Sequence, residues 1–203
     1  MDNRITIGIT GASGAPYAMV LIKSLLSANW QVHLVISNAG RMVLADEIGL
    51  NLPANISKAK TILCERLGAS EQELHLYGLQ DWTSVIASGS SAPKNMVICP
   101  CTGGTLSSVA TGASNNLIER GADVVLKEKG KLIMLFRELP LSLIHIENMK
   151  TVTLAGACVM PASPGFYHHP KDIDDLVNFV VGRILDQLDI PQDLIEPWGY
   201  TKH

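Results

Sequence analysis

Residues 4–17 read RITIGITGASGAPY, and this stretch decides how the chain is expected to fold. The run Arg4–Thr10 is rich in β-branched residues and stops at Gly11, which is typical of a strand buried inside a sheet. A helical pattern follows over 16–28, with proline in its first turn, where a missing N–H costs little. A buried strand, a glycine turn and a helix together predict the first unit of an α/β sheet.

The same alternation continues to the end of the chain. Further strands are expected at 31–37, 96–100, 131–137 and 157–161, and further helices at 40–48, 57–67, 115–127, 142–154 and 172–188. The segment 51–95 is less regular and contains a short LHLY run at 74–77. Short apolar strands alternating with helices predict a three-layer α/β fold with a parallel sheet, Rossmann-like or flavodoxin-like. We expect residues 1–189 to form a single domain and 190–203 to be a tail that packs on a neighbouring subunit.

Composition limits the kind of protein this can be. The 203 residues are 47% hydrophobic and 17% charged with a net charge of −3, which excludes a disordered chain. Soluble domains have about 25% charged residues, so part of this surface is expected to be buried in a homo-oligomer or against a membrane. No run of about 18 apolar residues and no leader pattern occurs, which favours a cytoplasmic oligomer without membrane contact. The absence of a basic cluster argues against nucleic acid as a partner.

Two groups of residues that could suggest a metal have simpler explanations. Cys99-Pro100-Cys101 has no second cysteine pair at metal spacing, so we expect the four cysteines to be free thiols and no zinc to be bound. The acidic residues at 172–175 suit the first turn of a helix better than a magnesium site. No metal is therefore expected.

Ligands of parallel α/β sheets bind outside the carboxyl ends of the strands, so the residues after each strand are the place to look for a site. The first turn, G-x-x-G-x-x-G at 8–14, could hold a phosphate at a helix N-terminus, although a turn that needs glycine only for packing explains it equally well. The second strand ends in Ser37, where an NAD-binding fold would place an acidic residue. FMN, with one phosphate, fits these features better than NAD or ATP.

Charged residues near the strand ends form a second group of candidates. Arg137 and Glu138 follow a buried strand, where an ion pair is costly unless it is used. Lys127, Arg183 and Tyr167 could join Arg137 around one small dianion, although each also suits an ordinary surface position. His145, on an apolar helix, is expected to be a core histidine with satisfied hydrogen bonds.

Four segments together resemble the UbiX family of flavin prenyltransferases: GITGASGA at 8–15, CPCTGGTLSSVATGASNNLIERGADVVLKE at 99–128, FRELPLSLIHIENM at 136–149 and MPASPGFYHHP at 160–170. The likeness runs from about residue 4 to residue 198. The wider superfamily contains FMN-dependent cysteine decarboxylases, which have a histidine in the helix after the second strand and a P-x-M-N-x-x-M-W segment. Residues 38–48 here contain no histidine, and that segment is absent, so prenyl transfer is favoured.

The resemblance implies a reaction and its partners. UbiX-type enzymes join a dimethylallyl group from dimethylallyl monophosphate to N5 and C6 of reduced FMN without a metal. The product, prenylated FMN, serves UbiD-type decarboxylases in ubiquinone synthesis or in aromatic acid breakdown. Family members form dodecamers and share each site between subunits. Two alternatives stay open: an FMN-dependent cysteinyl decarboxylase, and a flavin-binding accessory subunit without activity.

The resemblance also assigns site residues by matched motif. It implies that the flavin is held by Gly11, Ala12, Ser13, Ser37, Thr102, Gly103, Gly104, Thr105 and Arg137. For the prenyl phosphate it implies Lys127, Tyr167 and Arg183, assisted by Arg120 and the backbone at Gly89. Glu138 would be the acid or base near C6, Ser13 would lie near N5, and Glu47 would be a second acid. Trp82 and Trp198 could line the prenyl pocket.

Overall fold

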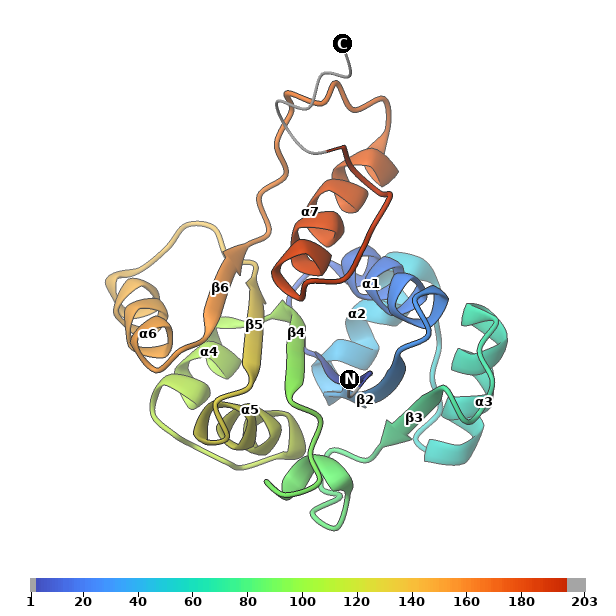
Figure 1. Cartoon of the computed structure of the whole chain (residues 1–203), viewed down its shortest axis with the longest axis vertical. Coiled ribbons are helices and arrows are strands. Elements are labelled where there is room, and N and C mark those ends of the chain that lie inside the picture. Colours follow the sequence, from blue (N-terminus) through green and yellow to red (C-terminus); the bar gives the residue numbers. More distant parts are fainter. Residues whose placement is uncertain (1–2, 197–203) are drawn as a thin grey trace.

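The computed structural model describes residues 3–196, which form a six-stranded sheet in which every strand is parallel to its neighbours (Figure 1). The strands are β1 (Arg4–Ile9), β2 (Gln31–Ile36), β3 (Leu74–Tyr77), β4 (Asn95–Cys101), β5 (Lys131–Phe136) and β6 (Cys158–Pro161). Their order across the sheet is β3-β2-β1-β4-β5-β6. This is the strand order of the Rossmann fold, so the expected fold class is confirmed.

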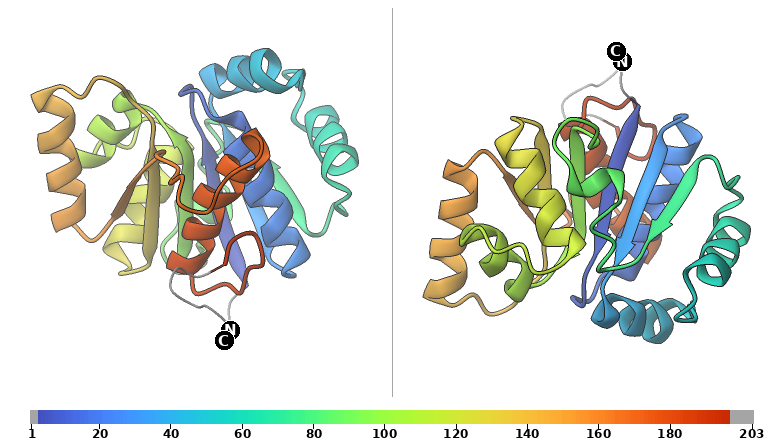
Figure 2. Two further views of the ribbon diagram at one scale, coloured as in Figure 1. Left: turned by 90° about the horizontal axis from the view of Figure 1, so that it is seen from above. Right: turned by 90° about the horizontal axis from the view of Figure 1, so that it is seen from below.

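Helices cover both faces of the sheet, as the two views of Figure 2 show. One face packs against α1 (Ala15–Ser27), α2 (Asn38–Ile48), α3 (Ile56–Leu67) and α7 (Ile173–Gln187). The other face packs against α4 (Gly103–Ala110), α5 (Leu117–Lys127) and α6 (Leu143–Leu154). Successive strand residues alternate between these two cores, as expected for a sheet buried on both sides.

The direction of the crossovers reverses between β1 and β4, the two central strands. β1 pairs with β2 on one side and with β4 on the other, and the helices that follow β1 and β4 lie on opposite faces. A crevice therefore opens at the carboxyl ends of these two strands. Thr10 joins the two ends: its hydroxyl donates to the carbonyl of Pro100 at 2.7 Å and accepts from the backbone N–H of Thr102 at 3.0 Å.

One helix was not expected from the sequence. Residues 103–110 follow β4 and form α4, a position where the sequence pattern predicts no helix. Glycine, serine and threonine have low helix propensity, which hid this element. The helix is stabilised from outside its own sequence, because Thr102 caps its N-terminus and α6 packs across it.

The described part of the tail packs on its own chain. Ile190 is buried, and the Gln192 amide donates to the Asp186 carboxylate of α7 at 3.3 Å. Ile195 lies so close to Gly182 of α7 that a Cβ there would be 2.8 Å from it. Packing of residues 190–203 on a neighbouring subunit stays a prediction, and Trp198 lies outside the described residues. Within residues 3–196, no helix combines the length and apolarity needed to cross a bilayer.

Candidate functional site

The glycine turn after β1 leads into α1, whose N-terminus is capped by Glu47, a side chain from the end of α2. The Glu47 carboxylate accepts hydrogen bonds from the backbone N–H of Gly14 at 3.0 Å and of Ala15 at 2.8 Å. Gly14 has φ of +133°, which favours glycine, and a Cβ on Gly11 would lie 2.4 Å from the Cβ of Ala39. The glycines therefore have a packing reason, and their presence alone does not demonstrate a ligand.

Glu47 is held as a carboxylate in spite of its position against the turn. Burial by itself raises the pKa of Glu47, but hydrogen bonds from the Ser13 hydroxyl and from the backbone of Gly14 and Ala15, with the charge of Arg137, outweigh burial and lower it. The carboxylate thus orients Ser13, whose side chain is exposed at this edge. An ionised Glu47 is suited to accept a proton and less suited to act as the second acid that the resemblance implies.

Two more helices begin at the same edge of the sheet. Ser37 caps α2, its hydroxyl accepting from the backbone N–H of Gly40 at 3.0 Å. Thr102 caps α4 in the same way by accepting from the N–H of Thr105 at 3.1 Å. Since α1, α2 and α4 follow neighbouring strands, their N-termini lie side by side. The Glu47 carboxylate occupies the end of α1, and the positive ends of α2 and α4 favour a bound phosphate.

Arg137 and Glu138 extend this edge beyond β5. The Arg137 Nε atom is buried and has no hydrogen-bond partner within residues 3–196. A buried donor without a partner is costly, which indicates that Arg137 is kept at this edge for a purpose other than stability. Glu138 is exposed, and its Oε1 accepts from the backbone N–H of Leu139 at 3.2 Å. The helix ends and the unpaired guanidinium fit an anionic flavin.

A second group of expected residues lies at the opposite edge. Lys127, at the end of α5, forms an ion pair with Glu128, and both side chains lie against Gly89, where a Cβ would be 2.6 Å from Lys127 Nζ. Arg120 donates to the carbonyl of Ala87 at 3.2 Å. Because α5 ends where β5 begins, Lys127 and Arg137 are separated by the length of a strand, roughly 20 Å. One chain therefore does not bring them together.

A third group lies between β6 and α7, on the segment that projects at the top of Figure 1. The Tyr167 ring meets Phe179 of α7 edge to face, with 5.5 Å between the ring centroids. Arg183, one turn further along α7, pairs with Asp186 at 2.7 Å.

Trp82 lies elsewhere and is exposed on the loop that precedes the short 3₁₀ turn Val85–Ala87. These aromatic and cationic side chains are accessible to a partner molecule.

The structure corrects one expectation and adds one residue. His145 is half-buried at the N-terminus of α6, where its ring accepts a hydrogen bond from the backbone of Ser142, so its placement in the core was wrong. Thr10 was not identified from the sequence, although a threonine directly before a glycine turn at a strand end was a usable signal. Cys99 and Cys101 are free and fully buried, as expected for core residues.

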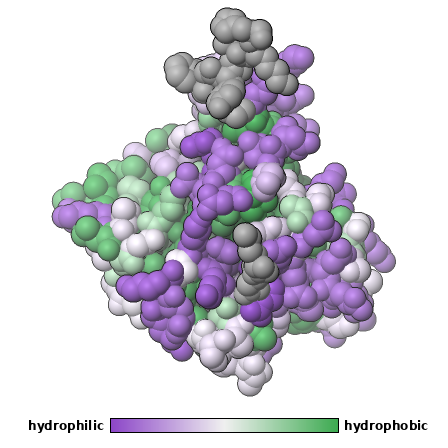
Figure 3. Space-filling model, viewed as in Figure 1, coloured by the Kyte–Doolittle hydropathy of each residue, from purple (hydrophilic) through white to green (hydrophobic). Residues whose placement is uncertain are grey.

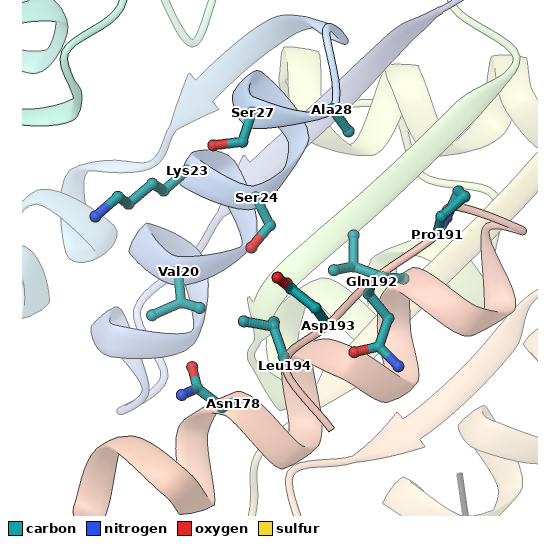
Figure 4. A pocket seen from close by; sticks show the side chains of 11 residues that line it. Val20, Lys23, Ser24, Ser27, Ala28, Asn178, Pro191, Gln192, Asp193 and Leu194 are labelled. Carbon is teal, nitrogen blue, oxygen red and sulfur yellow. The ribbon is translucent and has the colours of Figure 1, made fainter. Parts of the chain in front are cut away.

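A cleft of about 740 Å³ lies between α1, α7 and the described part of the tail, as Figure 4 shows. Its lining is mixed and mainly apolar, with Val20 from α1, Leu185 from α7 and Leu194 from the tail, and with polar groups such as Lys23 and Asp193 among them. The lining comes from the C-terminal half of α1, from α7 and from the tail, away from the carboxyl ends of β1 and β4. The cleft is therefore separate from the candidate flavin site.

Apolar side chains are exposed on α6 and on the loop that leads into it. Leu143 and Ile144 are 72% and 71% exposed, and Leu139 and Leu154 are more exposed still. Figure 3 shows hydrophobic residues gathered on the left of the molecule, where α6 lies in the same view. An exposed apolar face of this kind is typical of a surface that contacts another protein, a membrane or a ligand.

Comparison with known proteins agrees with this description. The Flavoprotein family model matches residues 1–185. A flavin prenyltransferase UbiX from Pseudomonas aeruginosa is 51% identical over 97% of this chain and 94% of its own length.

Two solved structures are also similar over almost the whole chain. The crystal structure of AnUbiX in complex with FMN and dimethylallyl pyrophosphate has a TM-score of 0.86 and 33% identity, covering 98% of both chains. A dodecameric FMN-dependent UbiX-like decarboxylase from Escherichia coli O157:H7 has a TM-score of 0.83 and 34% identity, covering 96% of this chain and 98% of its own. The chain described here belongs to the Flavoprotein family and, within it, to the UbiX flavin prenyltransferases.

Proposed function

We propose that this chain transfers a dimethylallyl group from dimethylallyl monophosphate to N5 and C6 of reduced FMN. In the transfer, the C–O bond to phosphate breaks, phosphate leaves, and C1′ of the prenyl group bonds to N5 as N5 loses its proton. The prenyl C2′=C3′ double bond then gains a proton at C2′ while C3′ bonds to C6, and the ring closes as C6 loses its proton. Bound reduced FMN supplies the two nucleophilic positions. The observation that carries the proposal is the pair of helix N-termini that follow β2 and β4, with the charge of Arg137 on the adjoining strand end.

The residues at the carboxyl edge would bind and orient the flavin. The N-termini of α2 and α4, capped by Ser37 and Thr102, favour its phosphate, and Arg137 provides a fixed charge between the two ligands. Glu47 keeps Ser13 in place beside N5. Glu138, which is exposed and next to Arg137, would be the group that takes the proton from C6.

The prenyl phosphate would be held by cations from more than one subunit. Lys127, Gly89 and Arg120 are far from Arg137 within one chain, so they can complete a site only in an assembly. Tyr167, on the projecting segment, and Arg183, on α7, are both exposed, and they would be available to the prenyl phosphate. Cations at a departing phosphate stabilise the charge that develops as the C–O bond breaks.

The exposed apolar face of α6 supports a homo-oligomer, and the dodecameric structure similar to this chain suggests that number of subunits. A UbiD-type decarboxylase is the proposed recipient of prenylated FMN. The four free thiols fit a reducing compartment, so a cytoplasmic location is proposed as well.

Mass spectrometry of the flavin tests the proposal. The protein is incubated without oxygen with FMN, dithionite and dimethylallyl monophosphate, and in parallel with the diphosphate. A gain of one C5H8 unit on the flavin is expected with the monophosphate. An unchanged FMN mass with both donors would reject prenyl transfer.

The similar protein from Escherichia coli is described as a decarboxylase, so decarboxylation is the competing activity. Release of carbon dioxide from a cysteinyl peptide, measured in the same preparation, would support that alternative. Binding of FMN with neither activity would support an accessory flavin-binding subunit.

A further inference from the structure

His145 lies beside the candidate flavin site, although no role has been assigned to it above. Its ring closes a capping box at the start of α6: the backbone N–H of Ser142 donates to Nδ1 at 3.2 Å, and the backbone N–H of His145 donates to the Ser142 hydroxyl at 3.2 Å. The edge of the Phe136 ring supports the imidazole, with 5.6 Å between centroids. The ring is therefore fixed from two sides.

The capping box determines which ring nitrogen holds the proton. A backbone N–H can only donate, so Nδ1 of His145 must be an acceptor. In the neutral imidazole the proton then resides on Nε2, which is left as a donor. Within residues 3–196, Nε2 has no hydrogen-bond partner. The helix cap thus leaves Nε2–H of His145 oriented and free to donate to a ligand.

Nε2 is directed at the first residue of α4. A Cβ on Gly103 would lie 2.9 Å from Nε2 and 3.8 Å from Glu138 Oε2, so imidazole and carboxylate both border the space above this glycine. The N–H groups that begin α4 open at the same place, and the buried Arg137 Nε, another unpaired donor, is on the adjoining strand end. The imidazole N–H and the N–H groups of the helix end are donors suited to an anionic oxygen, and Glu138 borders the same gap as an acceptor.

We propose that His145 is a flavin-binding residue whose Nε2–H donates to the phosphate of FMN at the N-terminus of α4. The inference rests on the proposed function in that FMN is taken to be the ligand of this edge. It explains why position 103 is glycine, since a methyl group would displace either the imidazole or the phosphate. It also gives Ser142 a function, because its N–H selects the tautomer that can donate.

Two substitutions separate the two ring nitrogens. In His145→Asn the amide oxygen replaces Nδ1, so the cap of α6 is kept while the Nε2 donor is removed. In His145→Gln the amide nitrogen replaces Nε2, so the donor is kept. Binding of FMN and of riboflavin, which has no phosphate, is measured by quenching of flavin fluorescence for the full-length protein and both variants. His75→Asn on β3 is a matched control at a histidine away from this edge.

The expected result is a loss of FMN affinity of roughly tenfold or more in His145→Asn, as for the loss of one hydrogen bond to a charged group. Riboflavin affinity should be unchanged, His145→Gln should bind FMN almost as the unaltered chain does, and His75→Asn should affect neither flavin. Unchanged FMN affinity in His145→Asn, or an equal loss for both flavins, would overturn the assignment. No binding measurement depends on turnover, so a chain that binds FMN but transfers no prenyl group would refute the proposed function and leave this inference standing.

Discussion

The carboxylate of Glu47 accepts a hydrogen bond at 2.8 Å from the backbone N–H of Ala15, so the last turn of α2 caps the first turn of α1. An acidic group at a helix N-terminus is stabilising, and here it also connects two helices that follow neighbouring strands. Through Ser13, the same carboxylate fixes the residue expected beside N5 of the flavin. Fold and site therefore depend on one side chain.

Glu47→Gln should lower stability and remove part of its dependence on pH. The amide cannot accept hydrogen bonds as strongly, and a loss of about 0.5–1 kcal/mol in the free energy of unfolding is expected for an exposed cap. Because folding lowers the pKa of Glu47, its contribution is complete above the ordinary carboxyl value of 4.5 and is lost as pH falls through the folded pKa. Urea unfolding at pH 7 and at pH 4 measures the difference in unfolding free energy between the unaltered protein and Glu47→Gln. This difference should be smaller at pH 4.

Asp46→Asn provides the control for Glu47, since Asp46 is an exposed acid on the same turn of α2. It should leave the unfolding free energy within about 0.5 kcal/mol of the original. If the two substitutions have equal effects at pH 7, the cap contributes nothing beyond surface charge.

Arg137→Met should weaken flavin binding without harming the fold. The substitution removes a guanidinium whose Nε has no partner in the described chain, so the unfolding free energy should change by less than about 1 kcal/mol. FMN affinity should fall roughly tenfold or more, because a charged donor to the ligand is lost. Fluorescence titration with FMN measures the affinity, and Arg66→Met, at the exposed end of α3, is the matched control. Wild-type affinity in Arg137→Met would remove this residue from the site.

The α6 face should be required for assembly. Ile144→Lys places a charge in the centre of the exposed apolar surface, where its burial between subunits would be costly. Sedimentation velocity should show smaller species than the unaltered chain forms, with an unchanged circular dichroism spectrum. Thr61→Lys, on the exposed side of α3, should leave the assembly intact. An unaltered chain that sediments as a monomer would refute the interface itself.

The cysteines of β4 should be unreactive in the folded protein. Burial raises the pKa of the Cys99 and Cys101 thiols well above the ordinary value, so little thiolate forms at mildly alkaline pH. Iodoacetamide labelling followed by peptide mass spectrometry should find both unlabelled in native protein and labelled in urea. Half-buried Cys158 should be labelled sooner than either. Rapid native labelling of Cys99 or Cys101 would show that β4 opens readily.

The sequence predicted the fold and one edge of the site because both depend on local patterns. A buried strand followed by a small or capping residue locates Ser37 and Thr102 without knowledge of the rest of the chain. His145 could not be placed in this way, since its role at the start of α6 depends on a backbone N–H and on a glycine from another helix. The distance between Lys127 and Arg137 could have been foreseen. Lys127 ends the helix that precedes β5 and Arg137 follows β5, so the two residues lie at opposite edges of the sheet.

That separation predicts complementation between inactive variants. Lys127→Ala and Arg137→Ala should each lose most prenyl transfer, since each removes a cation from one half of a shared site. When the two are unfolded together and refolded as a mixture, roughly a quarter of the original activity should return, because about one site in four draws both intact halves from different subunits. The control is to mix the two variants after separate refolding, which should restore nothing if subunits do not exchange. Activity that stays at the level of the single variants after joint refolding, in assemblies of normal size, would mean that both residues act within one chain.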